Sequence, residues 1–277
     1  MRGDAAMGRV ILRPVSPGRA SDRAFLRASA LLFAASVAAT VAWCGPMSAM
    51  GGMAMPGGWT RSMAWVRAPG QTWAGLAVSF LGMWVVMTAA MMLPSLLPTL
   101  GRYRWAVGRA GGARVNRLTA LVGAGYAAVW TAIGAALFPL GVAAVAVLTA
   151  RPALARAAPT AAGIVVALAG LFQFTVWKAR QLARCREAPG RGGPLFADSG
   201  TAWRHGVRLG LRCGQSCANL TAVLVVLGVT ELRVMAVLGA AITVERLGPG
   251  DGRAARAVGA VLVVTGALLI ARAAGLG

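Results

Sequence analysis

The stretch "WVVMTAAMMLPSLLPTL", residues 84–100, decides the fold class, because seventeen consecutive residues carry no charge. It continues an apolar run that starts near Trp73, and a helix of about 20 such residues spans the hydrocarbon core of a bilayer. Similar runs recur along the 277 residues, of which 58% are hydrophobic and only 13% charged. The mean hydropathy of +0.69 is too high for a soluble protein of this length. The sequence therefore predicts an all-α, polytopic transmembrane helical bundle.

The apolar runs predict about seven spans. We expect the helices near 25–43, 73–100, 118–148, 161–177, 206–229, 232–245 and 255–274. The sixth helix is short for a span, so the number falls to six if this helix is re-entrant. We expect one transmembrane domain, residues 24–277, after a disordered basic tail at residues 1–23.

The arginines predict how the chain lies in the membrane. The formal net charge is +21, and the charges gather in the tail and in the segments 101–117, 178–208 and 246–256, whereas the alternating connections hold fewer. Cytoplasmic loops carry this excess of basic residues. We therefore expect a multi-pass cell-membrane protein in a lipid bilayer, with a cytoplasmic N-terminus and an extracytoplasmic loop at 44–72. Because no DNA- or RNA-binding motif accompanies the charge, we expect no nucleic-acid partner.

Sulfur-bearing side chains are the strongest candidates for chemistry. Met87 and Met91 are four residues apart, and so are Cys213 and Cys217 in "RLGLRCGQSCANL", so each pair shares one face of a helix. The predicted topology puts both pairs in the inner half of the membrane on antiparallel helices, where we expect them to face one another. Such soft ligands suit Cu(I) better than zinc or an iron–sulfur centre. Packing is the alternative, since methionine fills gaps and free cysteine behaves as a small hydrophobe.

Prolines interrupt the helix that carries these methionines. Pro94 cannot bond to the carbonyl of Ala90, and its ring crowds that carbonyl. We therefore expect the helix to bend just before Pro94, beside Met91 and Met92.

Further candidate metal ligands lie outside this cluster. His205 is the only histidine and precedes Cys213 by two turns. Four methionines of the 44–72 loop resemble extracytoplasmic copper-collecting tracts, although low complexity explains them equally well: Met47, Met50, Met53 and Met55.

Polar residues within the predicted spans are costly and tend to have a partner or a function. Gln173 and Asn219 are of this kind. Glu231 and Glu245 mark the ends of the short sixth helix, near Arg233 and Arg246, and we interpret them as interfacial ion pairs.

Three segments together resemble a bacterial family. They are "MWVVMTAAMMLPSLLP", "FQFTVWKARQLARCREAP" at residues 172–189, and "RHGVRLGLRCGQSCANLTAVLVVLGVTELRVMAVLGAAITVERLGP" at residues 204–249. In this order they resemble the domain of unknown function 2182 family, described as predicted metal-binding integral membrane proteins, over about residues 70–275. The resemblance implies a metal ligand role for Cys213 and Cys217, and it matches Cys185 and Glu245 to family positions.

The chain also departs from that family's pattern. Ser216 stands where a cysteine is expected, Gln181 where the partner cysteine of Cys185 is expected, and Arg246 where a lysine is expected. Thr221 and Thr230 replace methionines. The resemblance therefore implies metal binding with fewer sulfur ligands than in the rest of the family.

Three classes of function remain compatible with the sequence. The leading hypothesis is copper binding or handling, with a metal-delivery or oxidase partner protein. A non-enzymatic membrane scaffold, such as an assembly partner of a membrane oxidoreductase, is the second, and a small-solute permease is the third. We do not expect an enzyme, because no nucleophile or acid–base pair stands out, and no phosphate-binding or dinucleotide motif occurs.

Overall fold

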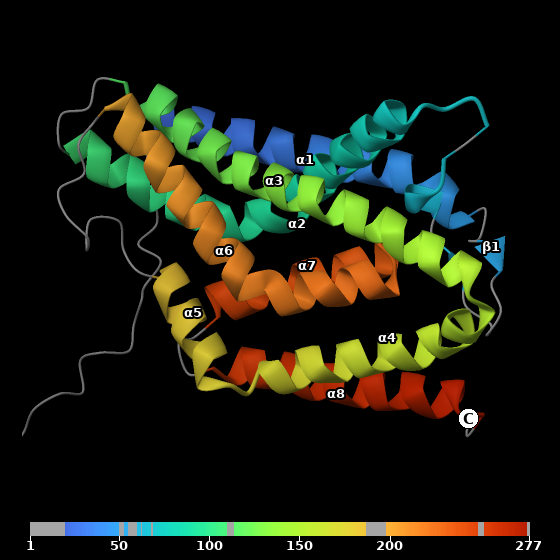
Figure 1. Ribbon diagram of the computed structural model, residues 1–277. Coiled ribbons are helices and arrows are strands. Elements are labelled where there is room, and N and C mark those ends of the chain that lie inside the picture. Colours follow the sequence, from blue (N-terminus) through green and yellow to red (C-terminus); the bar gives the residue numbers. More distant parts are fainter. Residues whose placement is uncertain are drawn as a thin grey trace, which may run out of the picture.

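A bundle of long helices makes up the described part of the chain (Figure 1). This computed structural model describes residues 20–49, 53–54, 60–61, 63–67, 69–109, 114–186, 198–248 and 252–275. The helices are α1 (Ala20–Ala49), α2 (Trp73–Arg109), α3 (Val115–Ala150), α4 (Pro152–Phe172), α5 (Val176–Arg186), α6 (Ser199–Leu227), α7 (Leu232–Leu247) and α8 (Arg253–Ala273). A two-residue antiparallel pair, β1 (Met53–Ala54) with β2 (Thr60–Arg61), and a 3-10 turn at Met63–Trp65 precede α2. The all-α prediction is confirmed.

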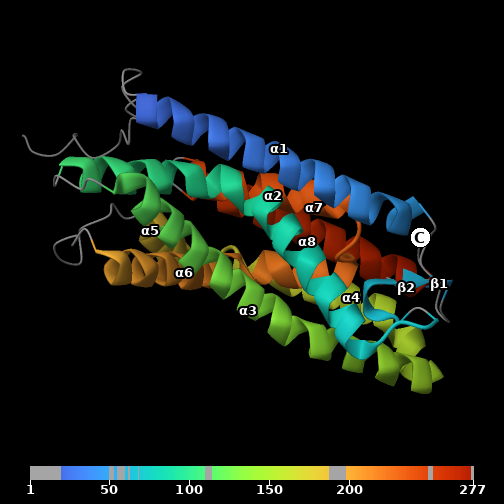
Figure 2. The ribbon, with the colours of Figure 1, turned by 90° about the horizontal axis from the view of Figure 1, so that it is seen from above.

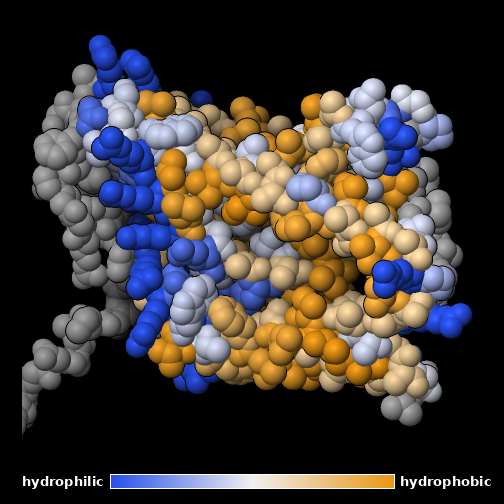
Figure 3. All heavy atoms as spheres, viewed as in Figure 1, coloured by the Kyte–Doolittle hydropathy of each residue, from blue (hydrophilic) through white to orange (hydrophobic). Residues whose placement is uncertain are grey.

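Six of the described helices are long and apolar enough to cross a membrane: α1, α2, α3, α4, α6 and α8. The 16-residue α7 is shorter than these six. Gly228, at φ +124°, ends α6, and α7 begins four residues later, so α6 and α7 form a helical hairpin. In Figure 3, hydrophilic residues gather at the two ends of the visible face, and an apolar band lies between them. The long helices run between these two ends, as the membrane prediction requires.

Several predicted boundaries were wrong. The expected 44–72 loop begins later, because α1 continues through Cys44 and Pro46 to Ala49. The expected 161–177 helix is α4 at Pro152–Phe172, because Pro152 fits the first turn, where its missing N–H costs nothing. The first 19 residues, most of the expected tail, lie outside the described ranges.

The predicted 178–208 loop was also wrong, because it contains α5 and the start of α6. The buried residues of α5 are Lys178, Gln181, Leu182 and Cys185, and their spacing gives one continuous stripe along the helix. Polar and basic residues dominate this helix, so hydropathy alone does not distinguish it from a loop.

The α2 helix contains both prolines, Pro94 and Pro98. Figures 1 and 2 show that α2 changes direction within its length, which agrees with the bend that we expect from Pro94. Ser95 Oγ donates a hydrogen bond to the carbonyl of Met92 at 3.0 Å, so a side chain supports the backbone in this turn.

Glycines allow the helices that carry the site to pack closely. A Cβ at Gly206 of α6 would lie 2.2 Å from the carbonyl oxygen of Val122, and a Cβ at Gly125 of α3 would lie 2.6 Å from that of Trp203. The α4–α8 contact is equally close at Gly170 and Gly266. Small residues at such contacts are typical of membrane helix pairs. Close α3–α6 packing brings Tyr126 against Cys213.

Candidate metal centre

Two buried cysteines on α6 form the centre of the site. Cys213 is 0% exposed and Cys217 is 2% exposed, and both are free thiols. Their sulfurs are 4.0 Å apart, because residues four apart lie one above the other on a helix. No disulfide joins them in this structure, so both sulfurs are available to an ion.

A methionine from α2 supplies the third sulfur. Met92 Sδ lies 4.0 Å from Cys213 Sγ, and Met92 is 3% exposed. The sequence predicted that Met87 and Met91 face the two cysteines, and the sulfur contact that the structure gives to Cys213 comes from their neighbour Met92. Consecutive residues on a helix point about 100° apart, so Met91 and Met92 leave α2 in different directions.

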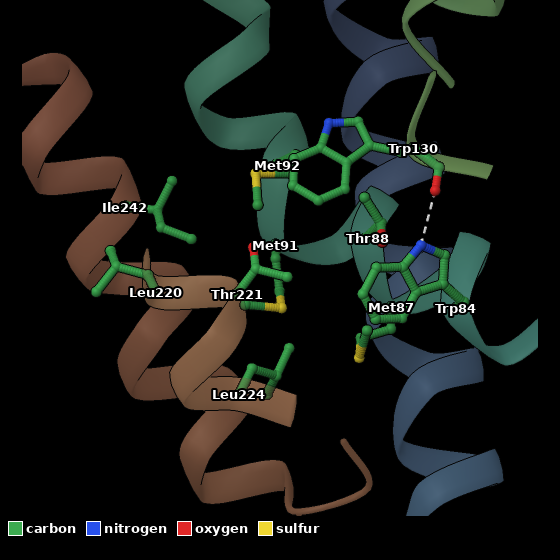
Figure 4. Close-up of a pocket in the computed structure, with 10 residues that line it drawn as sticks. All are labelled: Trp84, Met87, Thr88, Met91, Met92, Trp130, Leu220, Thr221, Leu224 and Ile242. Carbon is green, nitrogen blue, oxygen red and sulfur yellow. Dashed lines mark hydrogen bonds between the residues drawn. The ribbon is translucent and has the colours of Figure 1, made fainter. Parts of the chain in front are cut away.

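Met87 and Met91 line a small cavity next to this sulfur cluster. Figure 4 shows both side chains with Met92 on the α2 side, and Thr221 and Leu224 of α6 opposite them. The cavity has a volume of about 10 Å³, enough for one water-sized species. Helix α7 also packs against Met91, since a Cβ at Gly239 would lie 3.4 Å from Met91 Cγ. Thus α2 presents three thioethers to this region, and Met92 is the one with a sulfur contact to Cys213 among the described contacts.

Two polar side chains also contact Cys213. The Tyr126 hydroxyl of α3 lies 3.0 Å from Cys213 Sγ. Arg246 Nη1 of α7 donates hydrogen bonds to Cys213 Sγ and to Ser95 Oγ, both at 3.0 Å. Arg246 is only 8% exposed. A guanidinium therefore lies inside the bundle, directly beside the cysteine sulfur.

A fourth sulfur approaches from α5. Cys185 Sγ donates to the carbonyl of Arg212 and to Ser216 Oγ, each at 3.4 Å. Ser216 Oγ also lies 3.6 Å from Cys217 Sγ. Ser216 thus stands between Cys185 and the α6 cysteines. Burial raises the pKa of the Cys185 thiol, which agrees with its role here as a hydrogen-bond donor.

A buried ion pair supports this end of the site. Lys178 Nζ lies 2.8 Å from Glu245 Oε2, and the two side chains are 0% and 2% exposed. Lys178 also donates to the carbonyl of Ser216 at 2.7 Å, and Gln173 Nε2 donates to Glu245 Oε1 at 2.7 Å. The interpretation that pairs Glu245 with Arg246 was wrong, because these consecutive residues point to different sides of α7. Glu245 pairs with α5, and Arg246 turns to α2 and α6.

Of the other predicted ligands, His205 is the one whose side-chain surroundings the structure describes. His205 stacks on the Tyr103 ring, with centroids 5.3 Å apart, and lies about 12 Å along α6 from Cys213. Met47 falls in the last turn of α1 and Met53 in β1, whereas Met50 and Met55 are outside the described residues. The proposed ligand roles of these five residues remain predictions.

A larger cavity opens beside the sulfur cluster, between α1, α2 and α3. Its volume is about 580 Å³, and its lining is mostly apolar. Met92, Tyr126 and Trp130 line it, so the two residues that contact Cys213 from α2 and α3 also face this space. Trp84 Nε1 donates to the carbonyl of Trp130 at 2.8 Å and fixes α2 against α3 at this point (Figure 4).

The donor set fits a soft, monovalent ion. Within the described ranges, no three His, Cys, Asp or Glu side chains gather at a point where they could hold a metal ion. The third sulfur next to Cys213 and Cys217 is therefore the Met92 thioether, and a set of two cysteines and a methionine is a soft one that suits Cu(I). Three sulfurs bonded at about 2.3 Å in a plane around one ion lie about 4.0 Å apart. The Met92–Cys213 and Cys213–Cys217 separations both have this value.

A comparison with protein families agrees with this chemistry. The chain belongs to a family of copper chaperones, because the model of the PpoB2 copper chaperone family matches residues 81–269. The match runs from α2 to α8 and includes all the sulfurs discussed above except Cys44 and the methionines before α2. No curated protein and no solved structure matches the chain.

Sequence reasoning missed three neighbours of Cys213: Met92, Tyr126 and Arg246. Met92 lies in the opening stretch, but the phase of a helix near a proline is hard to predict. Arg246 was detectable, because an arginine that follows a buried glutamate on a short apolar helix needs a partner of its own. No sequence signal distinguishes Tyr126 from other residues of α3.

Proposed function

We propose that this protein is a multi-pass membrane chaperone that binds one Cu(I) ion between Met92, Cys213 and Cys217. The observation that carries the proposal is the buried group of soft sulfurs with two separations of 4.0 Å. Family membership supports copper as the cargo. Holding and passing an ion requires no bond chemistry on a substrate, so the proposed role is not enzymatic.

Neighbouring sulfurs extend the site in both directions along the bundle. Met87 and Met91 continue from Met92 toward the start of α2, and Cys185 lies beyond Ser216 on the opposite side. Neutral thioethers bind Cu(I) more weakly than thiolates do, so the ion would rest at the cysteines and exchange through the methionines. In this proposal the methionines of the segment 47–55 collect copper, and a partner protein delivers or receives it.

The proposal is tested with purified protein in detergent under reducing, anaerobic conditions. We expect one tightly bound Cu(I) per chain in competition with a Cu(I) chelator. X-ray absorption should show a first shell of sulfur only, at about 2.3 Å. A protein that takes no copper from the chelator, or a first shell dominated by nitrogen or oxygen, would contradict the proposal.

We also propose that the N-terminus is cytoplasmic. The arginine-rich connections α2–α3, α5–α6 and α7–α8 then share the cytoplasmic side, as the positive-inside rule requires. A cysteine placed at exposed Pro69, before α2, should react with a membrane-impermeant thiol reagent in intact cells. A matched cysteine at exposed Ser199 should react only after lysis, and the four native cysteines are buried. The reverse labelling pattern would refute this orientation.

A further inference from the structure

Arg246 places a positive charge where a cation is to be bound. Its guanidinium is 8% exposed and donates to Cys213 Sγ at 3.0 Å. The structure gives two carboxylate ion pairs among its described residues, Arg104–Asp22 and Lys178–Glu245, and Arg246 belongs to neither. The adjacent carboxylate, Glu245, is engaged by Lys178 and Gln173. The negative charge closest to Arg246 must therefore come from the sulfur site itself.

Counting charges shows which ion this site suits. Cysteine binds metals as a thiolate. A monovalent ion with two thiolates and a neutral thioether carries a net charge of −1, which Arg246 cancels. A divalent ion with the same ligands is neutral, so Arg246 would leave one uncompensated positive charge in the bundle. Uncompensated buried charge is strongly unfavourable.

We propose that Arg246 is the residue that makes this site selective for monovalent over divalent soft ions. It acts by charge balance and by its fixed position, since Ser95 Oγ accepts a second hydrogen bond from the same Nη1. Arg246 is not a ligand, because guanidinium has no free lone pair for a metal. This inference rests on the proposed copper site and adds the basis of its selectivity.

Two pairs of ions isolate the effect of charge. Cu(I) and Zn(II) have the same number of electrons and differ by one charge, and Ag(I) and Cd(II) form a heavier pair of the same kind. Affinities for all four ions are measured in wild type, Arg246→Gln, Arg246→Lys and Arg233→Gln. Arg233 lies on the same helix but is exposed, so its variant removes a charge away from the site.

An opposite charge at this distance changes a charged group's equilibrium by about ten- to a thousandfold. We therefore expect Arg246→Gln to lower the monovalent-to-divalent affinity ratio at least about tenfold in both pairs. Arg246→Lys should keep most of the ratio, and Arg233→Gln should not change it. An unchanged ratio in Arg246→Gln would overturn the inference.

A second variant keeps the test decisive if Arg246→Gln does not fold. Ser216→Cys adds a third thiolate close to Cys217 while Arg246 is retained. The charge count then becomes neutral for a divalent ion, so the ratio should again fall at least about tenfold. No shift in this variant would also overturn the inference. By contrast, a Cys213→Ser/Cys217→Ser variant that still binds Cu(I) like wild type would refute the copper site itself.

Discussion

Replacing both α6 cysteines by serine is expected to lower the Cu(I) affinity by more than about 100-fold. Loss of an outer-shell partner alone costs about 10- to 100-fold in metal affinity, and these two residues supply the only thiolates within 4.0 Å of each other. Each single variant should lose most of the affinity, because it removes one of the two thiolates that hold the ion and balance its charge. Chelator competition on the purified variants measures the effect.

The methionine variants should weaken Cu(I) binding to different degrees, in a defined order. Met92→Leu is expected to weaken Cu(I) binding about tenfold, because it removes the thioether next to Cys213 and preserves the side-chain volume. Met91→Leu and Met87→Leu should have smaller effects on affinity. They should instead slow exchange of copper with a chelator if ions pass along α2.

Cys44→Ser is the matched control for these variants. Cys44 is fully buried, as Cys213 is, but it lies on α1 and is not one of the sulfurs that contact Cys213. Its variant should bind copper like wild type. Equal losses in Cys44→Ser and Cys213→Ser would show that the effect comes from destabilising the fold, and the assignment of the site would then be wrong.

The helical bundle was predictable because hydropathy alone identifies long apolar helices. Every predicted apolar run corresponds to a helix. The main boundary errors occur at Pro46, at Pro152, in the basic segment after Phe172, and at residues 101–109, which were predicted as loop and belong to α2. The α5 helix was not predicted, because its buried stripe contains the polar residues Lys178 and Gln181. The burial of such residues depends on partners in other helices. Partners such as Glu245 lie more than 60 residues away and cannot be inferred from local pattern.

The sequence indicated which helices carry the candidate site, but it did not indicate which side chains contact each other there. Matching depths on α2 and α6 suggested that methionines and cysteines lie near one another, and the structure gives such a contact between Met92 and Cys213. The choice between Met91 and Met92 depends on the rotation of α2 about its axis, which the bend near Pro94 alters. The different directions of Glu245 and Arg246 follow from the 100° step of the helix, but only the packing of α7 tells which of the two faces the sulfurs.

The largest stability effect is expected at Lys178. Lys178→Met removes the cation that lies 2.8 Å from Glu245 and leaves a carboxylate buried at 2% exposure. Breaking a buried pair by removing one partner costs about 3–5 kcal/mol. It also removes the hydrogen bond to the Ser216 carbonyl, which lies between the two site cysteines in sequence. The free energy of unfolding in mixed detergent micelles should fall by this amount.

The loss of stability in Lys178→Met should come from the missing charge rather than from the changed side-chain volume. The double variant Lys178→Met/Glu245→Gln removes both charges and keeps an amide that can still pair with Gln173. It should recover more than half of the lost stability, because replacing a buried ion pair by uncharged residues often changes the free energy of unfolding very little. Asp22→Asn breaks a partly exposed pair with a 3.7 Å separation and should cost less than about 1 kcal/mol. If the double variant is no more stable than Lys178→Met, the contribution of Lys178 is packing, and the network of Gln173, Lys178 and Glu245 does not stabilise this end of the site by charge.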